Sequence, residues 1–467
     1  MNRSAWSQCR LVDKRYRSRA NHPPAGRTAA RKTRKGTRPA ADPRARMIEA
    51  MLASIGEQGY ATTVVADVIA KAVASRKTFY EHFEDKQACF FAMSDEVCGE
   101  WIARVEEKHD RREEGQHAID TLVNELFALA LESPPALRVI AVELTAAGAP
   151  GIERRERTLD RLAQPLRDSF GSDSHDVDLL ARSVVGAILR ILYSRARRGA
   201  RVRRPRRGDF LALAPDLAAW VSCYVSMRSP KIVSSSQGET STTVVVGGRA
   251  PGTLSLGSRA MERRGLPRGE GNVSRSFVIH NQRERILDAL ANLAAAKGFA
   301  ATTIPSIVQE AAVSVQAFYE HFSGKEDAFL VAYEIGHRKA LAIVERAYES
   351  QKEWPAAVRA GIAMLLEFLA SEPAYAHLAL IDALTASPKA ATVADQGMSA
   401  YMGMLEPGLQ SNANDLARTP IAIEATAGAL LELCFVYVAS ERTRELPGLT
   451  DFASEIALRP FVSASVS

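Results

Sequence analysis

One stretch of about fifty residues occurs twice in this 467-residue chain. Residues 46–92 align without gaps onto residues 285–331, at an offset of 239 positions, and 14 of the 47 aligned residues are identical. The densest match is Phe79-Tyr80-Glu81-His82-Phe83 against Phe318-Tyr319-Glu320-His321-Phe322. The period is far longer than the roughly 20–50 residues of stacked repeat arrays. The sequence therefore predicts that a whole domain has been duplicated.

The segments outside the repeat have a different composition. Residues 1–46 hold fourteen Lys and Arg against two Asp, a net charge of +12, whereas the whole chain carries +6. A basic arm of low hydrophobicity often touches nucleic acid. The alternatives are a solvated tail or a start codon placed too early, with Met47 as the later start. Residues 229–276 are rich in Ser, Gly and Pro, which predicts a flexible linker.

Each copy of the repeat has the periodicity of helices. Ile286, Leu290 and Leu293 fall on one face, and Lys297-Gly298 supplies a basic last turn and a C-terminal glycine. The threonines that follow this glycine predict the N-cap of a second helix.

A third short helix is expected after a tight turn. Ser75 and Ser314 are its predicted N-caps, and it ends near Phe83 and Phe322. The rest of each half shows long helical patterns with no βαβ rhythm. The predicted fold class is all-α.

Three such helices with a tight turn between the last two form a helix-turn-helix, whose third helix lies in the DNA major groove. Each copy also carries a Gly-aromatic pair, a Thr, a Val/Ile helix, a Ser, and then Phe-Tyr-Glu-His-Phe and Lys. In this pattern each copy resembles the tetracycline-repressor (TetR) family. The resemblance implies two tandem TetR-like units, each with a DNA-binding domain followed by a helical domain that dimerises and binds a ligand.

The predicted organisation follows from the repeat and the resemblance. It comprises a basic disordered arm (1–43), a first helix-turn-helix domain (44–92), a first regulatory domain (93–228), a flexible linker (229–277), a second helix-turn-helix domain (278–331) and a second regulatory domain (332–467).

The start of each third helix supplies the groups that contact bases. Arg76 and Lys77 can bond guanine O6 and N7, and Thr78 can bond a base or touch a thymine methyl group. From the resemblance, the tyrosine, the histidine and the following lysine lie near phosphates, as does a threonine at the N-terminus of the second helix. The predicted DNA contacts are Thr62, Thr63, Ser75, Arg76, Lys77, Thr78, Tyr80, His82 and Lys86 in the first copy, and Thr302, Thr303, Ser314, Val315, Gln316, Tyr319, His321 and Lys325 in the second. Phe79 and Phe83 are predicted core residues.

The second copy is chemically weaker. Gln316 can bond adenine and Val315 can touch a thymine methyl group, but no cation opens its third helix. Residues 44–92 carry no net charge, whereas residues 280–330 carry −2. Because phosphate attraction dominates affinity, the first unit should bind DNA more strongly. Both copies lack the glycine of the family's Ala-Gly-Val-Ser turn, and Val73 and Ala312 stand in its place.

Two units in one chain can pair with each other. A linker of about 48 residues spans roughly 38 Å, close to the 34–36 Å or so between adjacent half-sites. We expect an internal pseudo-dimer on an asymmetric double-stranded DNA operator. A homodimer of chains with four helix-turn-helix units is the alternative.

The regulatory domains are expected to hold a small-molecule effector. Candidate lining residues, each more readily explained as core, are Phe127, Tyr193, Trp220, Phe368, Tyr375 and Tyr437. An arginine run from Arg195 to Arg207 is expected to be a solvated loop, with anionic partners as the alternative.

Other function classes find little support. The five cysteines are scattered without zinc spacing, so reduced thiols, no metal and no cofactor are expected. No secretory signal, membrane span or catalytic motif is seen, which predicts a cytoplasmic, nucleoid-associated protein that is not an enzyme. The rival interpretation is a small-molecule or protein-binding module in which one or both helix-turn-helix units are vestigial.

Overall fold

The computed structural model describes residues 42–109, 115–171, 174–202, 207–225, 275–410 and 419–462. All of the basic arm (1–43) except Asp42 and Pro43 lies outside these residues, as do Cys9 and nearly all of the expected linker. Within them the chain is all-α, as predicted, and no strand is present.

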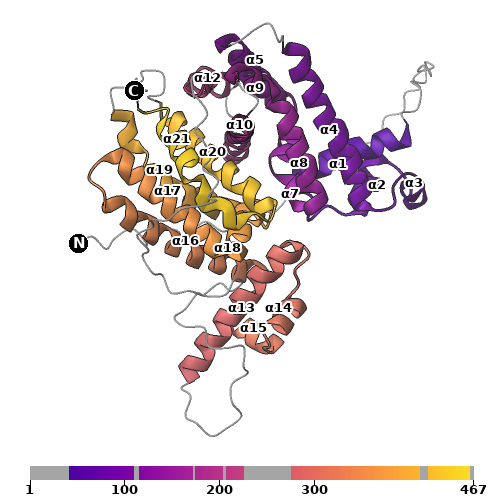
Figure 1. Ribbon diagram of the computed structural model, residues 1–467. Helices are drawn as coiled ribbons and strands as arrows, with labels where there is room; N and C mark the ends of the chain where they lie inside the picture. The colour runs from indigo at the N-terminus through magenta and orange to yellow at the C-terminus, as the bar shows by residue number, and fades with distance from the viewer. Residues whose placement is uncertain are drawn as a thin grey trace, which may run out of the picture. The chain divides into compact units, whose positions relative to one another are not determined.

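The described helices fall into two consecutive units (Figure 1). The first unit comprises α1 (Pro43–Gln58), α2 (Val65–Ala72), α3 (Arg76–His82), α4 (Lys86–Lys108), α5 (Gln116–Glu132), α6 (Pro134–Arg138), the π-helix η1 (Val139–Glu143), α7 (Leu144–Ala146), α8 (Ala149–Leu162), α9 (Gln164–Phe170), α10 (His175–Val202), α11 (Arg207–Leu211) and α12 (Ala214–Ser222). The second unit comprises α13 (Arg275–Lys297), α14 (Ile304–Glu310), α15 (Val315–His321), α16 (Lys325–Glu349), α17 (Trp354–Ser371), α18 (Pro373–His377), the π-helix η2 (Leu378–Asp382), α19 (Pro388–Gly403), the 3-10 helix η3 (Glu406–Gln410), α20 (Pro420–Ala439), the 3-10 helix η5 (Thr443–Leu449) and α21 (Thr450–Leu458).

Helix ends follow the expected signals. α1 ends at Gly59 and α13 ends at Gly298, both with positive φ, which glycine adopts without steric cost. Prolines start α6 and α18, where a missing main-chain N–H costs no hydrogen bond.

The domain boundaries drawn from the sequence need adjustment. α13 begins at Arg275, so the last residues of the expected linker are helical. α4 and α16 run without interruption across the boundaries expected at 92/93 and 331/332. Each helix-turn-helix domain is therefore joined to its regulatory domain by a continuous helix.

The arginine run does not begin as a solvated loop, because α10 extends through Val202. The described part of the run makes ion pairs with the second unit, Arg195 with Glu424 on α20 and Arg197 with Asp395 on α19.

α10 of the first unit packs along α20 of the second (Figure 1). The helices approach closely because small residues lie at the crossing. A Cβ atom on Gly428 would come 3.2 Å from the Cβ of Ala187, and one on Gly186 would come 2.5 Å from the Glu432 side chain. Helix α12 adds buried contacts: Trp220 Nε1 donates to Thr426 Oγ1 at 3.0 Å, and the Tyr224 hydroxyl donates to the Ile456 carbonyl at 2.9 Å.

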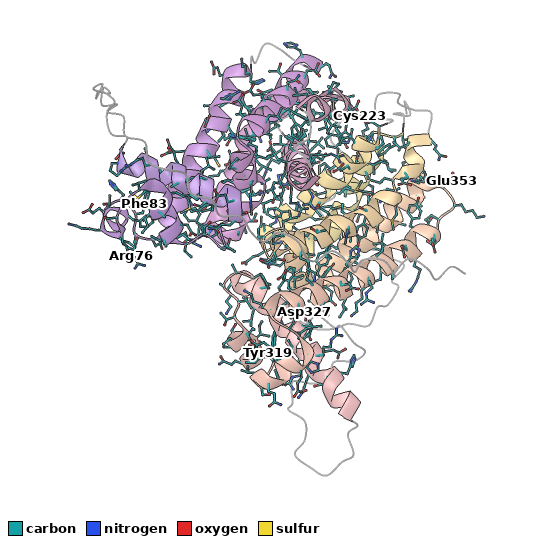
Figure 2. The ribbon with its side chains drawn as sticks, turned by 180° about the vertical axis from the view of Figure 1, so that it is seen from behind. Arg76, Phe83, Cys223, Tyr319, Asp327 and Glu353 are labelled. Atoms are coloured by element: carbon teal, nitrogen blue, oxygen red, sulfur yellow. The ribbon has the colours of Figure 1, made fainter. Side chains whose placement is uncertain are left out.

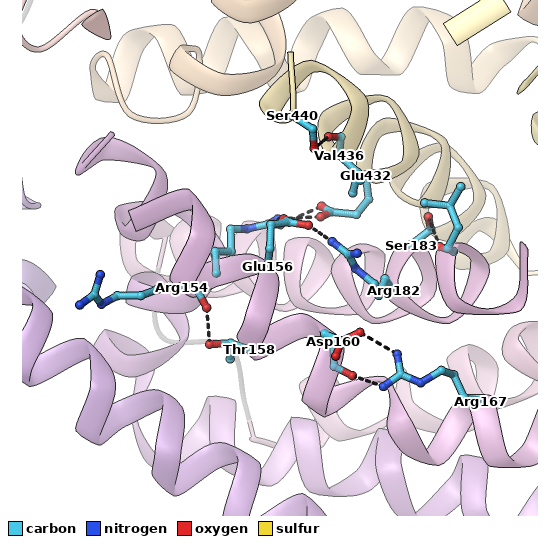
Figure 3. A network of polar contacts seen from close by, with 12 residues as sticks. Arg154, Glu156, Thr158, Asp160, Arg167, Arg182, Ser183, Glu432, Val436 and Ser440 are labelled. Carbon is cyan, nitrogen blue, oxygen red and sulfur yellow. Dashed lines mark hydrogen bonds and ion pairs between the residues drawn. The ribbon is translucent and has the colours of Figure 1, made fainter. Parts of the chain in front are cut away.

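A buried ion pair also joins the two units. Arg155 on α8 donates to both carboxylate oxygens of Glu432 on α20, at 2.7 and 2.8 Å, and both side chains are almost inaccessible. Glu156 on α8 contacts Arg155 and Arg182, so the pair belongs to a larger network (Figure 3).

Two described helices, α17 and α20, are long and apolar enough to cross a membrane by length and composition. α20 is largely buried inside the protein, where it forms the contact between the units, and α17 packs against α16 and α21. Their apolar character is accounted for by these packing roles.

Candidate nucleic-acid interface

The entry to the second helix differs between the two copies. In the second copy Thr303 is the N-cap of α14 and accepts from the Ser306 N–H, as expected. In the first copy the expectation is wrong: the N-cap of α2 is Val64, whose N–H is bonded by Asp67. Thr63 is fully buried and donates to the Gly59 carbonyl at 2.7 Å.

Thr62 and Thr302 are the other two threonines that precede the second helices, and both lie close to the preceding glycine. Thr62 is exposed and donates to the Gln58 carbonyl at 2.5 Å, whereas Thr302 is buried and donates to the Gly298 carbonyl at 3.0 Å.

The turn between the second and third helices is strained in both copies. Val73 has φ 50° and Ala312 has φ 49°, which places both in the left-handed region where the family pattern has glycine. A residue with a Cβ atom pays roughly 1–2 kcal/mol in this region, and a β-branched valine is the more unusual occupant. The Val73 side chain is 83% exposed, so burial gives little compensation.

Both third helices begin at the predicted serine. Ser75 accepts from the Thr78 N–H at 3.0 Å, and its hydroxyl lies 2.8 Å from the Thr78 hydroxyl. Ser314 accepts from the Ala317 N–H at 3.0 Å. These hydroxyls fix the N-terminal turn, which is the part of a recognition helix that faces base edges.

The outer face of α3 presents cations and an aromatic ring. Arg76 is exposed on the first turn (Figure 2). Lys77 beside it is also exposed, and Tyr80 is 51% exposed. Lys77 is only loosely paired with Glu81, at 3.9 Å. Phe79 is buried, as predicted, so the helix has one face in the core and one face toward solvent.

The outer face of α15 carries no cation. Val315 is 51% exposed and Tyr319 is 56% exposed. Tyr319 is labelled in Figure 2. The Gln316 amide donates to Glu320 at 3.1 Å. Phe318 is buried in the same way as its counterpart in the first copy. The face can supply amide and apolar contacts but attracts phosphate weakly.

The two histidines of the repeated motif also differ. His82 is exposed. His321 is partly buried, its Nε2 atom has no hydrogen-bond partner among the described residues, and burial together with nearby Arg283 lowers its pKa. The neutral form of His321 is therefore favoured, which weakens any attraction to phosphate.

Lys86 and Lys325 hold the fold together at equivalent points. Lys86 donates to the Tyr60 carbonyl at 3.0 Å and lies 4.2 Å from the centre of that ring. Lys325 donates to the Phe299 carbonyl at 2.8 Å and lies 4.2 Å from that ring. Burial lowers the pKa of both ammonium groups. Their predicted contact with phosphate stays a prediction.

Sequence reasoning missed the contacts that dock each helix-turn-helix onto its regulatory domain. In the first unit the buried Glu143 accepts from the Tyr60 N–H at 2.8 Å and from Arg138 Nε at 2.7 Å. In the second unit Asp382 accepts from the Phe299 N–H at 3.0 Å. Extending the offset of 239 beyond residue 331 pairs Glu143 with Asp382, and this signal could have found them.

A cavity of about 150 Å³ lies in the second unit, between α16, α17, α19 and α20. Of the six predicted lining residues only Tyr375 borders it. Phe368 packs against Tyr375, Tyr437 lies under Arg442, and Phe127 packs against Phe210. Trp220 belongs to the contact between the units.

A cavity of the first unit, lined by Val105 and Leu122 among others, measures about 10 Å³. Larger side chains at the equivalent positions of the first unit account for the difference in cavity volume. Ala340 and Gly361 border the larger cavity, and the residues 239 positions earlier are the buried Trp101 and Leu122.

Metal and thiol chemistry find no centre in the described residues. No group of three His, Cys, Asp or Glu side chains there could hold a metal ion. Cys89, Cys98, Cys223 and Cys434 form no disulfide among the described residues, and burial raises the pKa of each thiol.

Residues 47–93 and 286–332 both match the model of the bacterial regulatory proteins, tetR family. A stretch of 56 residues is 46% identical to the uncharacterized HTH-type transcriptional regulator YerO of Bacillus subtilis (strain 168), covering 12% of this chain. The match spans about a fifth (19%) of that relative's length.

Two solved structures are also similar. The transcriptional regulator FadR from Bacillus subtilis, crystallised with stearoyl-CoA, is 18% identical with a TM-score of 0.33, over 38% of this chain and 98% of that chain. A transcriptional regulator (TerR/AcrR family) from Aquifex aeolicus VF5 is 27% identical with a TM-score of 0.31, over 37% and 96%.

Proposed function

Because the chain belongs to the tetR family of bacterial regulatory proteins, with two units in tandem, we propose that it is a sequence-specific regulator of transcription. It binds a double-stranded DNA operator through its helix-turn-helix domains and acts as a ligand-responsive repressor in the cytoplasm. It is a binding protein and not an enzyme.

The observation that carries this proposal is the outer face of α3. Arg76 and Lys77 stand exposed on the first turn of a capped helix, with Tyr80 beside them. Guanidinium and ammonium groups at this position can bond guanine edges, and both attract phosphate. The first unit is therefore the stronger DNA-binding unit, and α15 contributes amide and apolar contacts.

The active form is proposed to be an internal pseudo-dimer. The contact between the two units buries Trp220, Tyr224 and the Arg155–Glu432 pair within one chain. Because the two recognition helices differ, the operator that they bind is asymmetric. A mass measurement that finds only dimers of chains at low concentration would contradict this form.

The test is selection of bound sequences from random duplexes by the full chain. Two variants accompany it, Arg76→Ala/Lys77→Ala and Val315→Ala/Gln316→Ala. A matched control, Arg338→Ala/Arg359→Ala, removes two positive charges from exposed positions on α16 and α17. The expected motif has two unlike halves, each lost with its own variant and neither lost with the control. Selection unaffected by the α3 variant would contradict the proposal.

A second candidate function is favoured by the asymmetry of the units. α15 has no cation, and the larger cavity belongs to the second unit. The second unit would then be a ligand-binding and pairing module with a vestigial helix-turn-helix. Enrichment of a half-site that is lost only with the α3 variant would favour this function.

A further inference from the structure

One charged side chain on the wall of the 150 Å³ cavity comes from the other unit. Arg190 lies on α10 of the first unit, whereas the other lining residues belong to the second unit. Those residues are apolar, aromatic, glycine or histidine, for example Leu365, Leu380 and Met398. The cavity is thus an apolar chamber with one guanidinium in its wall.

Arg190 has no direct ion pair with any described residue, although Asp395 and Glu432 lie near it. Among the described residues no hydrogen bond or ion pair to its guanidinium is present within 4 Å. The nearby carboxylates are already engaged, Asp395 with Arg197 and Glu432 with Arg155. Burial lowers the pKa of Arg190, with Asp395 opposing the shift. An arginine stays charged in proteins, so the site holds a positive charge that no direct ion pair with a described residue neutralises.

The charged side chains near the crossing of α10 and α20 are paired unequally. Arg190 stands four residues after Gly186 and lines the cavity, whereas Glu432 stands four residues after Gly428 and lies close to Gly186. Glu432 is met by the bidentate Arg155. Arg190 has no such acid facing it in the described residues, and it faces the cavity instead.

Neutral polar groups surround the same part of the cavity. The rings of Tyr333 and His337 stack with centroids 6.0 Å apart, and Tyr401 meets His337 edge-on at 5.5 Å. Burial raises the pKa of Tyr333 to about 12 and lowers that of His337. These groups can donate hydrogen bonds without adding charge.

We propose that the cavity binds a small apolar carboxylate whose carboxylate group pairs with Arg190, so that the effector site is completed by both units. A guanidinium fork matches a carboxylate with two parallel hydrogen bonds. A cavity of about 150 Å³ in another protein holds benzene, which sets the size at roughly that of benzoate. The inference rests on the proposed function only in taking this cavity as the effector site.

α10 connects the site to the first helix-turn-helix. It packs against α6 and η1, which carry Arg138 and Glu143. A ligand held by Arg190 therefore lies against the helix that supports the first DNA-binding domain.

The test is calorimetric titration of the full chain, without DNA, with benzoate and with benzamide up to 10 mM or so, the highest practical concentration. Benzamide has the same shape and no charge. We expect benzoate to bind about tenfold or more tightly than benzamide, as expected for a hydrogen-bonded charge. Equal affinities, or no binding of benzoate, would overturn the inference.

Variants assign the preference to Arg190. Arg190→Met should reduce the benzoate preference to about twofold or less, while Arg190→Lys should retain part of it. Arg338→Met, at an exposed position of α16, is the matched control and should change nothing. A preference that survives in Arg190→Met would also overturn the inference.

A second measurement covers the risk of misfolding and separates the two proposals. Arg190→Met removes an unpaired charge, so its Tm should equal or exceed that of the parent chain. Ala340→Trp, which copies Trp101 of the first unit, should fill the cavity and abolish benzoate binding. Both variants should still bind the selected DNA. If these variants lose benzoate binding and keep DNA binding, the result supports the proposed effector site. If the parent chain itself fails to bind DNA, the proposed function is wrong, whatever the result with benzoate.

Discussion

Glu143 and Asp382 perform the same task 239 residues apart. Each closes a π-helix and accepts the main-chain N–H of the aromatic residue that follows a left-handed glycine, Tyr60 in one unit and Phe299 in the other. Each also contacts a basic side chain five residues earlier, Arg138 or His377. The π-helices thus mark the joint at which a helix-turn-helix is attached to its regulatory domain.

Replacing Glu143 by Gln should loosen the first joint only. The change leaves Arg138 and the Tyr60 N–H less well paired in a buried place, which costs about 1–3 kcal/mol. Hydrogen exchange should show faster opening of α1–α3 with unchanged protection of α13–α15. Asp382→Asn, as the counterpart, should reverse this pattern, and equal effects on both domains would contradict the independence of the joints.

Val73→Gly should stabilise the protein. Glycine relieves a left-handed strain of roughly 1–2 kcal/mol but adds about 0.4–1 kcal/mol of chain entropy in the unfolded state. The expected gain is therefore about 1 kcal/mol, measured by urea denaturation. Val73→Ala retains a Cβ atom and should gain less. A glycine variant of lower stability would show that the turn is not strained.

The salt dependence of DNA binding should separate the two recognition helices. Each phosphate contact contributes about 0.9 to the slope of log K against log salt concentration. Arg76→Ala/Lys77→Ala should therefore lower the slope by up to about 2. Val315→Ala/Gln316→Ala removes no charge and should leave the slope unchanged while weakening discrimination between sequences.

Breaking the Arg155–Glu432 ion pair should destabilise the protein strongly, whereas replacing both residues by apolar ones should destabilise it little. Glu432→Gln leaves Arg155 buried with only Glu156 as an acidic partner, which costs about 3–5 kcal/mol. Arg155→Met/Glu432→Met should cost much less, because no buried charge is left and a methionine can still pack on Phe435. Urea denaturation of Arg155→Met, Glu432→Met and the double variant measures the coupling between the two residues, and additive losses would contradict it.

Asp288 on α13 should make the protein less stable at higher pH. Burial raises its pKa to about 7, Glu284 and Glu372 act in the same direction, and Lys339 opposes them. The folded state then holds a proton that the unfolded state has released, so the unfolding free energy falls as pH rises from about 4 to 7. Asp288→Asn should raise Tm clearly at pH 8 and little at pH 5. Glu326→Gln, at an exposed position of α16, is the control.

The parts that could be predicted from the sequence are local. The repeat motif placed Phe79 and Phe83 in the core, and the glycine and serine signals placed the end of the first helix and the start of the third in each copy. These features depend on residues a few positions apart. The motif also pointed to the exposed cations of α3.

The rest depended on residues far apart in the chain. Arg190 and Tyr333 both line the cavity only because α10 packs on α20. No spacing in the sequence predicts the packing of these two helices. Thr63 illustrates a different limit. Its hydroxyl could have capped α2 or bonded the Gly59 carbonyl, and only the depth of burial decides between them.

The pairing of two unlike units within one chain, through α10 and α20, has a consequence for how DNA specificity evolves. In a symmetric dimer one mutation alters both recognition helices together, so both half-sites must change at once. Here Arg76 and Val315 are encoded separately yet are carried by helices of one chain. In the proposed pseudo-dimer a single substitution therefore alters one recognition helix and leaves the other as it was, so that specificity for the two half-sites would evolve one half-site at a time.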